Sequence, residues 1–185
     1  MDNELLEDYS ISNVKISVTF LSTIPVETFK KNIQEKRSNL VCFKKNIIII
    51  KCEYTATIFF KPPGKYHVNI TKIKGLHNIE RSIFYIKKNF FPSSDFIFVK
   101  YEVDNITATL KLRQNFCLKK LSRTNSNVKF NSERFPGAFV TFDDLKGTAV
   151  VFTSGRINIL GCVTKLQINA ICRNLMFLLK EYAVC

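Results

Sequence analysis

Apolar and polar residues alternate strictly from Asn13 to Phe20. A period of two predicts a half-buried β-strand, because successive side chains of a strand point to opposite faces. The apolar side chains would line a core. Asn13 and Lys15 would then share the opposite face.

Three other segments repeat their apolar residues at the helical spacing of three and four, which predicts amphipathic helices. The first begins near Pro25, a favourable residue in a first helical turn. Phe116 to Leu121 is a weaker helix candidate, and it is followed by a polar run from Ser122 to Asn127. The apolar positions of the three stronger helices are Val26, Phe29 and Ile33; Leu76, Ile79, Ile83, Ile86 and Phe90; and Ile168, Ile171, Leu175, Leu178 and Tyr182.

Strand-like runs fill most of the remaining chain. Each half reads as a strand, a helix, three or more strands and a long helix, which predicts an α+β fold with helices on one face of a mainly antiparallel sheet. The other face would be open. The predicted strands are Phe43 to Glu53, Thr55 to Phe60 and Lys65 to Ile73 in the first half, and Phe96 to Leu112, Ala138 to Phe142, Thr148 to Phe152 and a run ending near Cys162 in the second.

Three markers recur at one offset, which indicates an internal repeat. Phe43 and Phe60 are 17 residues apart, and so are Phe135 and Phe152. The second pair lies 92 residues after the first, and Asn13 and Asn105 are separated by the same 92 residues. We therefore expect an acidic tail at residues 1–10, a first repeat at 11–94 and a second at 95–185, related by a pseudo-dyad.

The chain is basic, with a formal net charge of +13 and a pI of about 9.6. Residues 1–94 hold 15 Lys and Arg against 8 Asp and Glu, and residues 95–185 hold 13 against 7, so both halves are basic. Evenly spread positive charge suits a polyanion bound across both halves. An ordinary basic protein surface is the other interpretation, and charge alone does not separate the two.

Other kinds of site leave no pattern in the chain. The longest clear apolar run, Ile47 to Ile50, is far shorter than the roughly 18 residues of a membrane span. The six cysteines lack C-x-x-C spacing and are expected to be reduced thiols. We expect no membrane segment, cofactor, metal site or enzymatic activity, although a small basic α+β enzyme with an unrecognised active site remains an alternative.

The motifs ERFPG and VVFTSGRINILG, together with IFFKPPGK in the first repeat, resemble the TATA-binding protein family. The resemblance extends from about Asn13 to Tyr182. It implies a saddle of two pseudo-symmetric repeats, which form one curved antiparallel sheet with helices on its convex face. It also implies that the concave face lies on the minor groove of DNA.

The resemblance gives the recurring residues a role. Phe43 with Phe60, and Phe135 with Phe152, would wedge between base steps at the two ends of the site, a task suited to large, rigid, apolar side chains. Asparagine can donate hydrogen bonds to the minor-groove acceptors of adenine and thymine. Any single Phe among the 17 in the chain is more often a core residue, so the paired spacing is what distinguishes these four. The expected DNA-binding residues are Asn13, Lys15, Phe43, Phe60, Asn69, Asn105, Thr107, Phe135, Phe152 and Asn158.

The two repeats differ in the strand that follows the turn at Ser154-Gly155 and the matching turn in KPPGK. In the family, this strand contributes to the face that lies on the minor groove. Allowing one extra residue in KPPGK, we match Asn158 with His67 and Gly161 with Ile70. The resemblance also places arginines that hold phosphates where Ile49 and Thr141 stand here.

The resemblance also predicts partners. Glu133 and Arg134, just before the second FPG, would lie on the surface that the family uses for transcription factor IIB. The expected function is a divergent initiation factor that binds and bends A·T-rich promoter DNA and recruits a transcription factor IIB-like protein, other initiation factors and RNA polymerase. A protein-assembly platform that has lost DNA bending is the alternative. The Asn-, Lys-, Ile- and Phe-rich composition suggests a protist or a large DNA virus, and hence a nuclear or viral-factory location.

Overall fold

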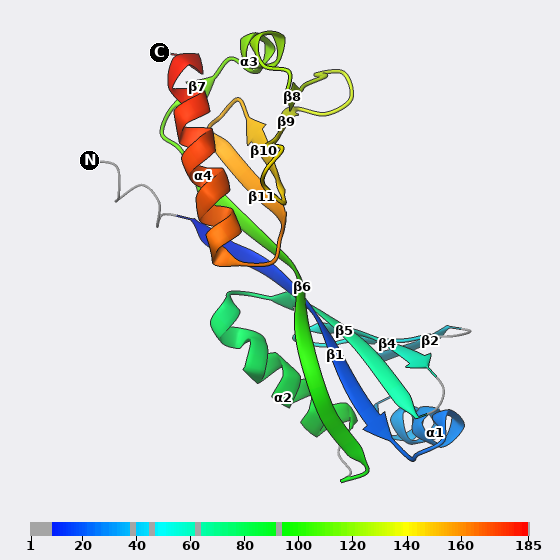
Figure 1. Ribbon diagram of the computed structural model, residues 1–185. Helices are drawn as coiled ribbons and strands as arrows, with labels where there is room; N and C mark the ends of the chain where they lie inside the picture. Colours follow the sequence, from blue (N-terminus) through cyan, green and yellow to red (C-terminus); the bar gives the residue numbers. More distant parts are fainter. Residues whose placement is uncertain (1–8, 38–39, 45–46, 62–63, 92–93, 185) are drawn as a thin grey trace. The chain divides into compact units, whose positions relative to one another are not determined.

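A computed structural model describes residues 9–37, 40–44, 47–61, 64–91 and 94–184. The chain separates into two compact units (Figure 1). The first unit is Asn13–Asp104, and the second is Asn105–Cys185 together with the residues before Asn13. The expected acidic tail lies outside the described residues up to position 8, and Ser10 already belongs to the first strand.

The described strands form a ten-stranded sheet in the order β2-β3-β4-β5-β1-β6-β11-β10-β9-β8, besides a two-stranded pair of β12 and β7. Neighbouring strands are antiparallel within β2-β3-β4-β5-β1 and within β6-β11-β10-β9-β8. Together with the helices, they confirm the predicted α+β class. Two long strands, β1 (Ser10–Ser22) and β6 (Phe96–Lys111), each run through both units.

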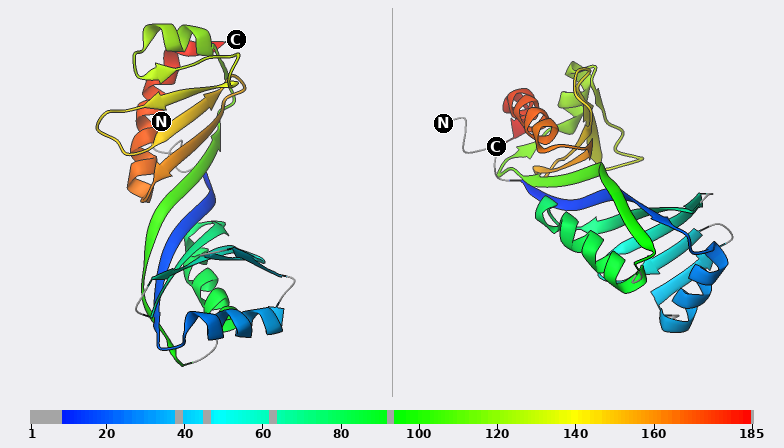
Figure 2. Two further views of the ribbon diagram at one scale, coloured as in Figure 1. Left: turned by 90° about the vertical axis from the view of Figure 1, so that its right-hand side faces the viewer. Right: turned by 60° about the horizontal axis from the view of Figure 1, so that its bottom comes forward.

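The first unit contains one part of β1 and one part of β6, with four further strands and two helices between them. The helices lie on one side of the strands (Figure 2). The elements in chain order are α1 (Val26–Arg37), β2 (Val41–Lys44), β3 (Ile47–Lys51), β4 (Thr55–Lys61), β5 (Lys65–Ile73), the 3-10 turn η3 (Leu76–Asn78) and α2 (Ile79–Phe90).

Aromatic side chains hold α1 against the sheet of the first unit. Phe29 of α1 stacks on Phe91 with ring centroids 5.0 Å apart, and Phe91 stacks in turn on Phe20 of β1 at 4.8 Å. Tyr66 packs edge-on against Phe29 at 5.1 Å and donates a hydrogen bond from its hydroxyl to the carbonyl of Ile24 at 2.7 Å. Large buried aromatics with offset or edge-on contacts contribute strongly to core stability. This cluster therefore marks the covered face of the sheet.

The second unit repeats the arrangement with a different set of lengths. Its long helix, α4, lies along one face of the strands (Figure 1). The elements are β7 (Asn115–Phe116), α3 (Leu118–Thr124), β8 (Val128–Lys129), β9 (Gly137–Thr141), β10 (Thr148–Phe152), β11 (Arg156–Cys162), α4 (Lys165–Leu179), the 3-10 turn η4 (Lys180–Tyr182) and β12 (Ala183–Val184).

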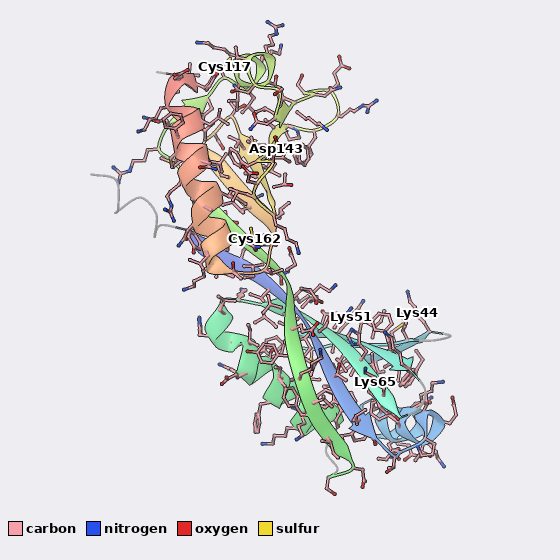
Figure 3. All side chains as sticks on the ribbon, in the orientation of Figure 1. Lys44, Lys51, Lys65, Cys117, Asp143 and Cys162 are labelled. Carbon is pink, nitrogen blue, oxygen red and sulfur yellow. The ribbon has the colours of Figure 1, made fainter. Side chains whose placement is uncertain are left out.

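A capping box begins α4. The hydroxyl of Thr164 accepts from the backbone N–H of Gln167, and the Gln167 side chain accepts from the N–H of Thr164. This reciprocal pair satisfies backbone donors that a helix start leaves unpaired. Cys162, at the end of β11, is buried near the first turns of α4 (Figure 3).

Two predicted boundaries differ from the structure. The run Phe43 to Glu53 was predicted as one strand, but β2 and β3 pair with each other as an antiparallel hairpin, with Phe43 opposite Ile48. The polar run Ser122 to Asn127 begins inside α3, which continues to Thr124. Tertiary contacts extend this helix, since the Thr124 hydroxyl lies 2.7 Å from the Tyr182 hydroxyl.

Candidate nucleic-acid interface

The open face of the second unit is defined by strand register. One cross-strand row runs through Thr109, Asn158, Val150, Phe139 and Lys129, each directly opposite the next. Directly paired residues of an antiparallel sheet share a face. The adjacent row, Ala108, Ile159, Ala149, Val140 and Val128, is buried throughout and forms the core beneath α4. The first row therefore belongs to the face that α4 does not cover.

Three phenylalanines gather at one end of this open face. The Phe135 ring lies 5.9 Å from the Phe152 ring and 5.3 Å from the Phe139 ring, centroid to centroid. Phe135 is 39% exposed and Phe139 is 41% exposed. The two phenylalanines predicted from their spacing thus meet on one apolar, partly exposed surface. Phe139 joins them, and the sequence reasoning had not selected it.

Gly137 makes room for this aromatic group. It lies opposite Phe152 in the ladder between β9 and β10. A Cβ at this position would come within 2.8 Å of Val150 Cγ1 and 2.9 Å of Phe135 Cε1, closer than real Cβ contacts. A larger residue at this position of the FPG motif would therefore displace Val150 or the Phe135 ring from its place beside Phe152.

Asn105 is held in one orientation beside a bulge in β11. Its Oδ1 accepts a hydrogen bond from the backbone N–H of Gly161 at 2.8 Å, and its Nδ2 donates to Thr107 Oγ1 at 3.3 Å. Because the oxygen is engaged by the backbone, the amide nitrogen is the group directed away from the bulge. The predicted residues Asn105 and Thr107 are thus in contact, and Asn158 Oδ1 accepts from Thr109 nearby at 3.3 Å.

The first unit repeats this device. Asn13 Oδ1 accepts from the backbone N–H of Lys72 at 2.9 Å. Lys72 has a positive φ of 66°, and Gly161 has a φ of 81°. The residue equivalent to Gly161 is therefore Lys72, so the match with Ile70 was wrong.

Strand register corrects a second match. Asn69 lies opposite Ser17, and Asn158 lies opposite Thr109. Ser17 and Thr109 are themselves 92 residues apart. Asn158 therefore corresponds to Asn69 and not to His67. The offset of 92 holds for β1 and β6, but it falls to 89 between β5 and β11.

The aromatic residue on the open face of β4 is Phe59. In the first unit, Thr57 of β4 lies opposite Asn69, and Phe59 is two residues further along β4. In the second unit, Val150 of β10 lies opposite Asn158, and Phe152 is two residues further along β10. Phe59 therefore corresponds to Phe152. Phe60 lies on the other face. It pairs with buried Tyr66, and its ring packs 6.2 Å from Phe29 of α1. The expectation that Phe60 shares the open face is therefore not met, because one residue along a strand reverses the face.

Phe43 also departs from the expected pattern. Its partner in the ladder, Ile48, is fully buried on the face covered by the helices, while Phe43 itself is 38% exposed. The 17-residue spacing thus selected two residues on the covered face of the first unit. Apolar alternation could have found Phe59, since Ala56, Ile58 and Phe60 form one apolar side of β4 and leave Phe59 on the other.

A charged group interrupts the open face of the first unit. Asp104 Oδ2 accepts a hydrogen bond from Ser17 Oγ at 2.5 Å and forms an ion pair with Lys15 Nζ at 3.5 Å. Ser17 Oγ also lies 3.1 Å from Asn69 Oδ1. Lys15 is therefore placed on the predicted face, but its charge is balanced by a carboxylate.

Lysines surround the rest of that face. Lys44, Lys51 and Lys65 are exposed, and Figure 3 locates them on β2, β3 and β5. By strand register, each of the three lysines lies on the open face of the sheet, which also carries Phe59 and Thr71. The helices cover the other face. Burial lowers the pKa of His67, opposite Phe59 on β5, and the positive charge of Lys61 lowers it further. His67 is thus biased towards its neutral form.

Glu133 and Arg134 are exposed in the loop between β8 and β9. Asn131 shapes this loop: its Oδ1 accepts from the N–H of Glu133 at 3.0 Å, and its carbonyl accepts from the N–H of Phe135 at 3.0 Å. Arg134 thus lies in a hydrogen-bonded turn directly before Phe135.

The described residues also bear on metal binding and membrane insertion. No group of three or more His, Cys, Asp or Glu there is arranged to hold a metal ion. In the same residues, no helix is long and apolar enough to cross a membrane.

Comparison with known proteins agrees with these features. Residues 100–182 match the family described as transcription factor TFIID, or TATA-binding protein (TBP). The TATA-box-binding protein of Thermococcus kodakarensis is 31% identical over 83 residues, which cover 45% of this chain and 44% of that protein. That of Pyrococcus horikoshii is 36% identical over 63 residues, covering 34% and 33%. The chain thus spans less than half the length of these curated relatives.

The fold is shared over nearly the whole chain. The structure of Methanococcus jannaschii TBP superimposes with a TM-score of 0.76 at 20% sequence identity, covering 94% of this chain and 99% of that one. Taken together, these comparisons show that residues 100–182 are similar to the TATA-binding protein family and that the chain has the fold of a TBP.

Proposed function

We propose that this protein is a TBP-like transcription initiation factor that binds the minor groove of A·T-rich promoter DNA and bends it. The observation that carries the proposal is the group of Phe135, Phe139 and Phe152 at one end of the face of the sheet that α4 does not cover. Exposed aromatic side chains on a basic protein suit insertion between base steps, where an apolar wedge replaces lost stacking.

Base reading in this proposal falls to the asparagines. Asn13 and Asn105 each have their oxygen bound to a backbone N–H, so each presents its amide nitrogen as a donor. The minor groove of A·T pairs offers only acceptors, whereas the guanine amino group would oppose such a donor. Thr107, Asn69 and Asn158 supply further polar atoms on the same faces. For the wedge of the first unit we propose Phe59 in place of Phe43 and Phe60.

The test is a salt titration of binding to an A·T-rich duplex labelled at both ends, with a G·C-rich duplex as control. We expect tight binding and a large rise in end-to-end fluorescence transfer on the A·T duplex alone. Replacing Phe135 and Phe152 together by Ala should abolish the rise. The matched control replaces Phe84 and Phe177, which are 65% and 80% exposed on α2 and α4, and should leave it intact.

An assembly platform that does not bend DNA is the second candidate, and Asp104 is the observation in its favour. The carboxylate of Asp104 on the open face of the first unit would be repelled by the negative potential of a minor groove. Unchanged fluorescence transfer on both duplexes, with weak binding that salt removes, would favour this candidate.

Partners follow from the same proposal. Exposed Glu133 would contact a transcription factor IIB-like protein, and other initiation factors and RNA polymerase would assemble around the bent DNA. The protein would act where its promoters lie, in a nucleus or, for a virus, in a cytoplasmic factory. Pull-down of purified candidate factors with the Glu133→Lys variant would test the contact.

A further inference from the structure

We infer that Lys129 and Arg134 form a phosphate clamp that holds one DNA strand next to the aromatic group of the second unit. The inference rests on the proposed function and adds a site to it. Lys129 lies in the same cross-strand row as Phe139, directly opposite it. Arg134 directly precedes Phe135 in the chain. Both cations line the same groove as Phe135 and Phe139.

A groove joins these residues. It encloses about 480 Å³ at the edge of the sheet, and both cations line it together with Phe130, Phe135 and Phe139. Its walls carry no carboxylate. In the described part of the chain, neither Lys129 nor Arg134 forms an ion pair, since the four ion pairs found there involve other residues. Both positive charges are thus available to a ligand.

The groove has the chemistry of a phosphodiester site next to a kink. An inserted aromatic side chain opens a base step and brings the backbone on either side against the protein. Lysine and arginine are the usual partners of backbone phosphates, and arginine can bind two phosphate oxygens at once. On the other side of Phe152, Lys111 and Arg156 are paired across β6 and β11. The aromatic group therefore has two cations on each flank, an arrangement that suits the two strands of a DNA duplex.

The clamp reassigns Arg134 from the predicted partner surface to DNA. An acidic protein segment is the other ligand that two free cations beside exposed rings could attract, so the experiment must separate the two. DNA is favoured because the groove is continuous with the proposed wedge and shares Phe135 and Phe139 with it.

The experiment compares the dependence of DNA affinity on salt for two charge-matched variants. Lys129→Ala/Arg134→Ala removes the clamp, and Lys165→Ala/Arg173→Ala removes two exposed charges from α4 on the covered side of the unit. Each phosphate contact contributes about −0.9 to the slope of log K against log salt. We expect the clamp variant to lose about two contacts, so its slope becomes about 1.8 less negative, while the control keeps the original slope.

A duplex carrying uncharged methylphosphonates beside the kink gives an independent readout. The unmodified protein should bind this duplex more weakly than the unmodified duplex. The clamp variant should bind the two duplexes with nearly equal affinity. Both variants should keep the thermal midpoint of the unmodified protein, because the substituted side chains are exposed.

Equal slopes for the clamp and control variants, with DNA still bent by the unmodified protein, would overturn the clamp alone. If the unmodified protein fails to bend the A·T duplex, the proposed function falls and the clamp falls with it. The two failures are therefore distinguishable.

Discussion

The two units share a strand framework but present different open faces. In the second unit the central row passes from Thr109 and Asn158 to Val150 and Phe139, and three phenylalanines gather at its end. In the first unit the equivalent row is Ser17, Asn69, Thr57, Ile49 and Cys42. On that face of the first unit, Phe59 faces His67 with ring centroids 6.4 Å apart.

The difference shows which features of the repeat are tied to the fold. The bulge is retained in both units, with Asn13 on Lys72 and Asn105 on Gly161. Surface residues diverge between the units, because an exposed side chain can change without disturbing the core. The family match covers the second unit, where the aromatic group is complete.

The largest expected effect distinguishes the two neighbouring phenylalanines of β4. Phe60→Ala should lower the free energy of unfolding by about 2–3 kcal/mol, because its ring packs on Phe29 and Tyr66. Phe59→Ala should change it by less than about 1 kcal/mol and should reduce fluorescence transfer on the A·T duplex. Urea denaturation and the transfer assay measure the two properties. A stable Phe60→Ala protein with lost bending would reverse the assignment.

A smaller effect is expected from exchanging the two bulge residues. Gly161→Lys forces a side chain into the left-handed region and should cost about 1 kcal/mol. Lys72→Gly relieves the same strain but increases the entropy of the unfolded chain, so a gain of about 0.5 kcal/mol is expected. Urea midpoints of the two variants measure this. Shifts of the same sign would show that the bulges are not equivalent.

Removing the carboxylate should make the open face of the first unit more like that of the second. Asp104→Asn releases Lys15 from its ion pair. We expect affinity for the A·T duplex to rise about fivefold, which is on the order of 1 kcal/mol, and the salt slope to steepen by about 0.9. Asp143→Asn, on the exposed turn after β9, is the charge-matched control (Figure 3). Unchanged affinity would mean that this part of the face does not meet DNA.

The smallest effect is a pH dependence confined to the first unit. Because the pKa of His67 is lowered in the folded state, the unfolded chain binds the proton more readily. The stability from this residue is present above the unfolded pKa of about 6.5 and is lost as the pH falls through the lowered folded value. Thermal midpoints between pH 8 and pH 5 should fall less for His67→Gln than for the unmodified protein. Parallel curves would contradict the assignment.

Most of the fold could be predicted from the pattern of the chain. Most of the predicted apolar positions are buried: Phe29 and Ile33 in α1, Ile79, Ile83, Ile86 and Phe90 in α2, Ile168, Ile171 and Leu175 in α4, and Val14, Ile16, Val18 and Phe20 in β1. Val26, Leu76 and Leu178 are only half-buried. The pairing of Phe135 with Phe152 was predicted from spacing and resemblance, and the two rings do meet. Phe139 was missed because a strand residue with small neighbours gives no sign that a ring from a preceding loop will pack beside it.

Local periodicity alone was sufficient for the element types, because each helix or strand shows its buried side within a few residues. Assigning Phe59 instead of Phe60, and Lys72 instead of Ile70, required the pairing of strands distant in the chain. The physical reason is that a one-residue change of register reverses the face of every side chain in a strand. Residue spacing cannot reveal such a change when the loops of the two repeats differ in length. The hydrogen-bonded ladder therefore determines which side chains share the face proposed to meet DNA.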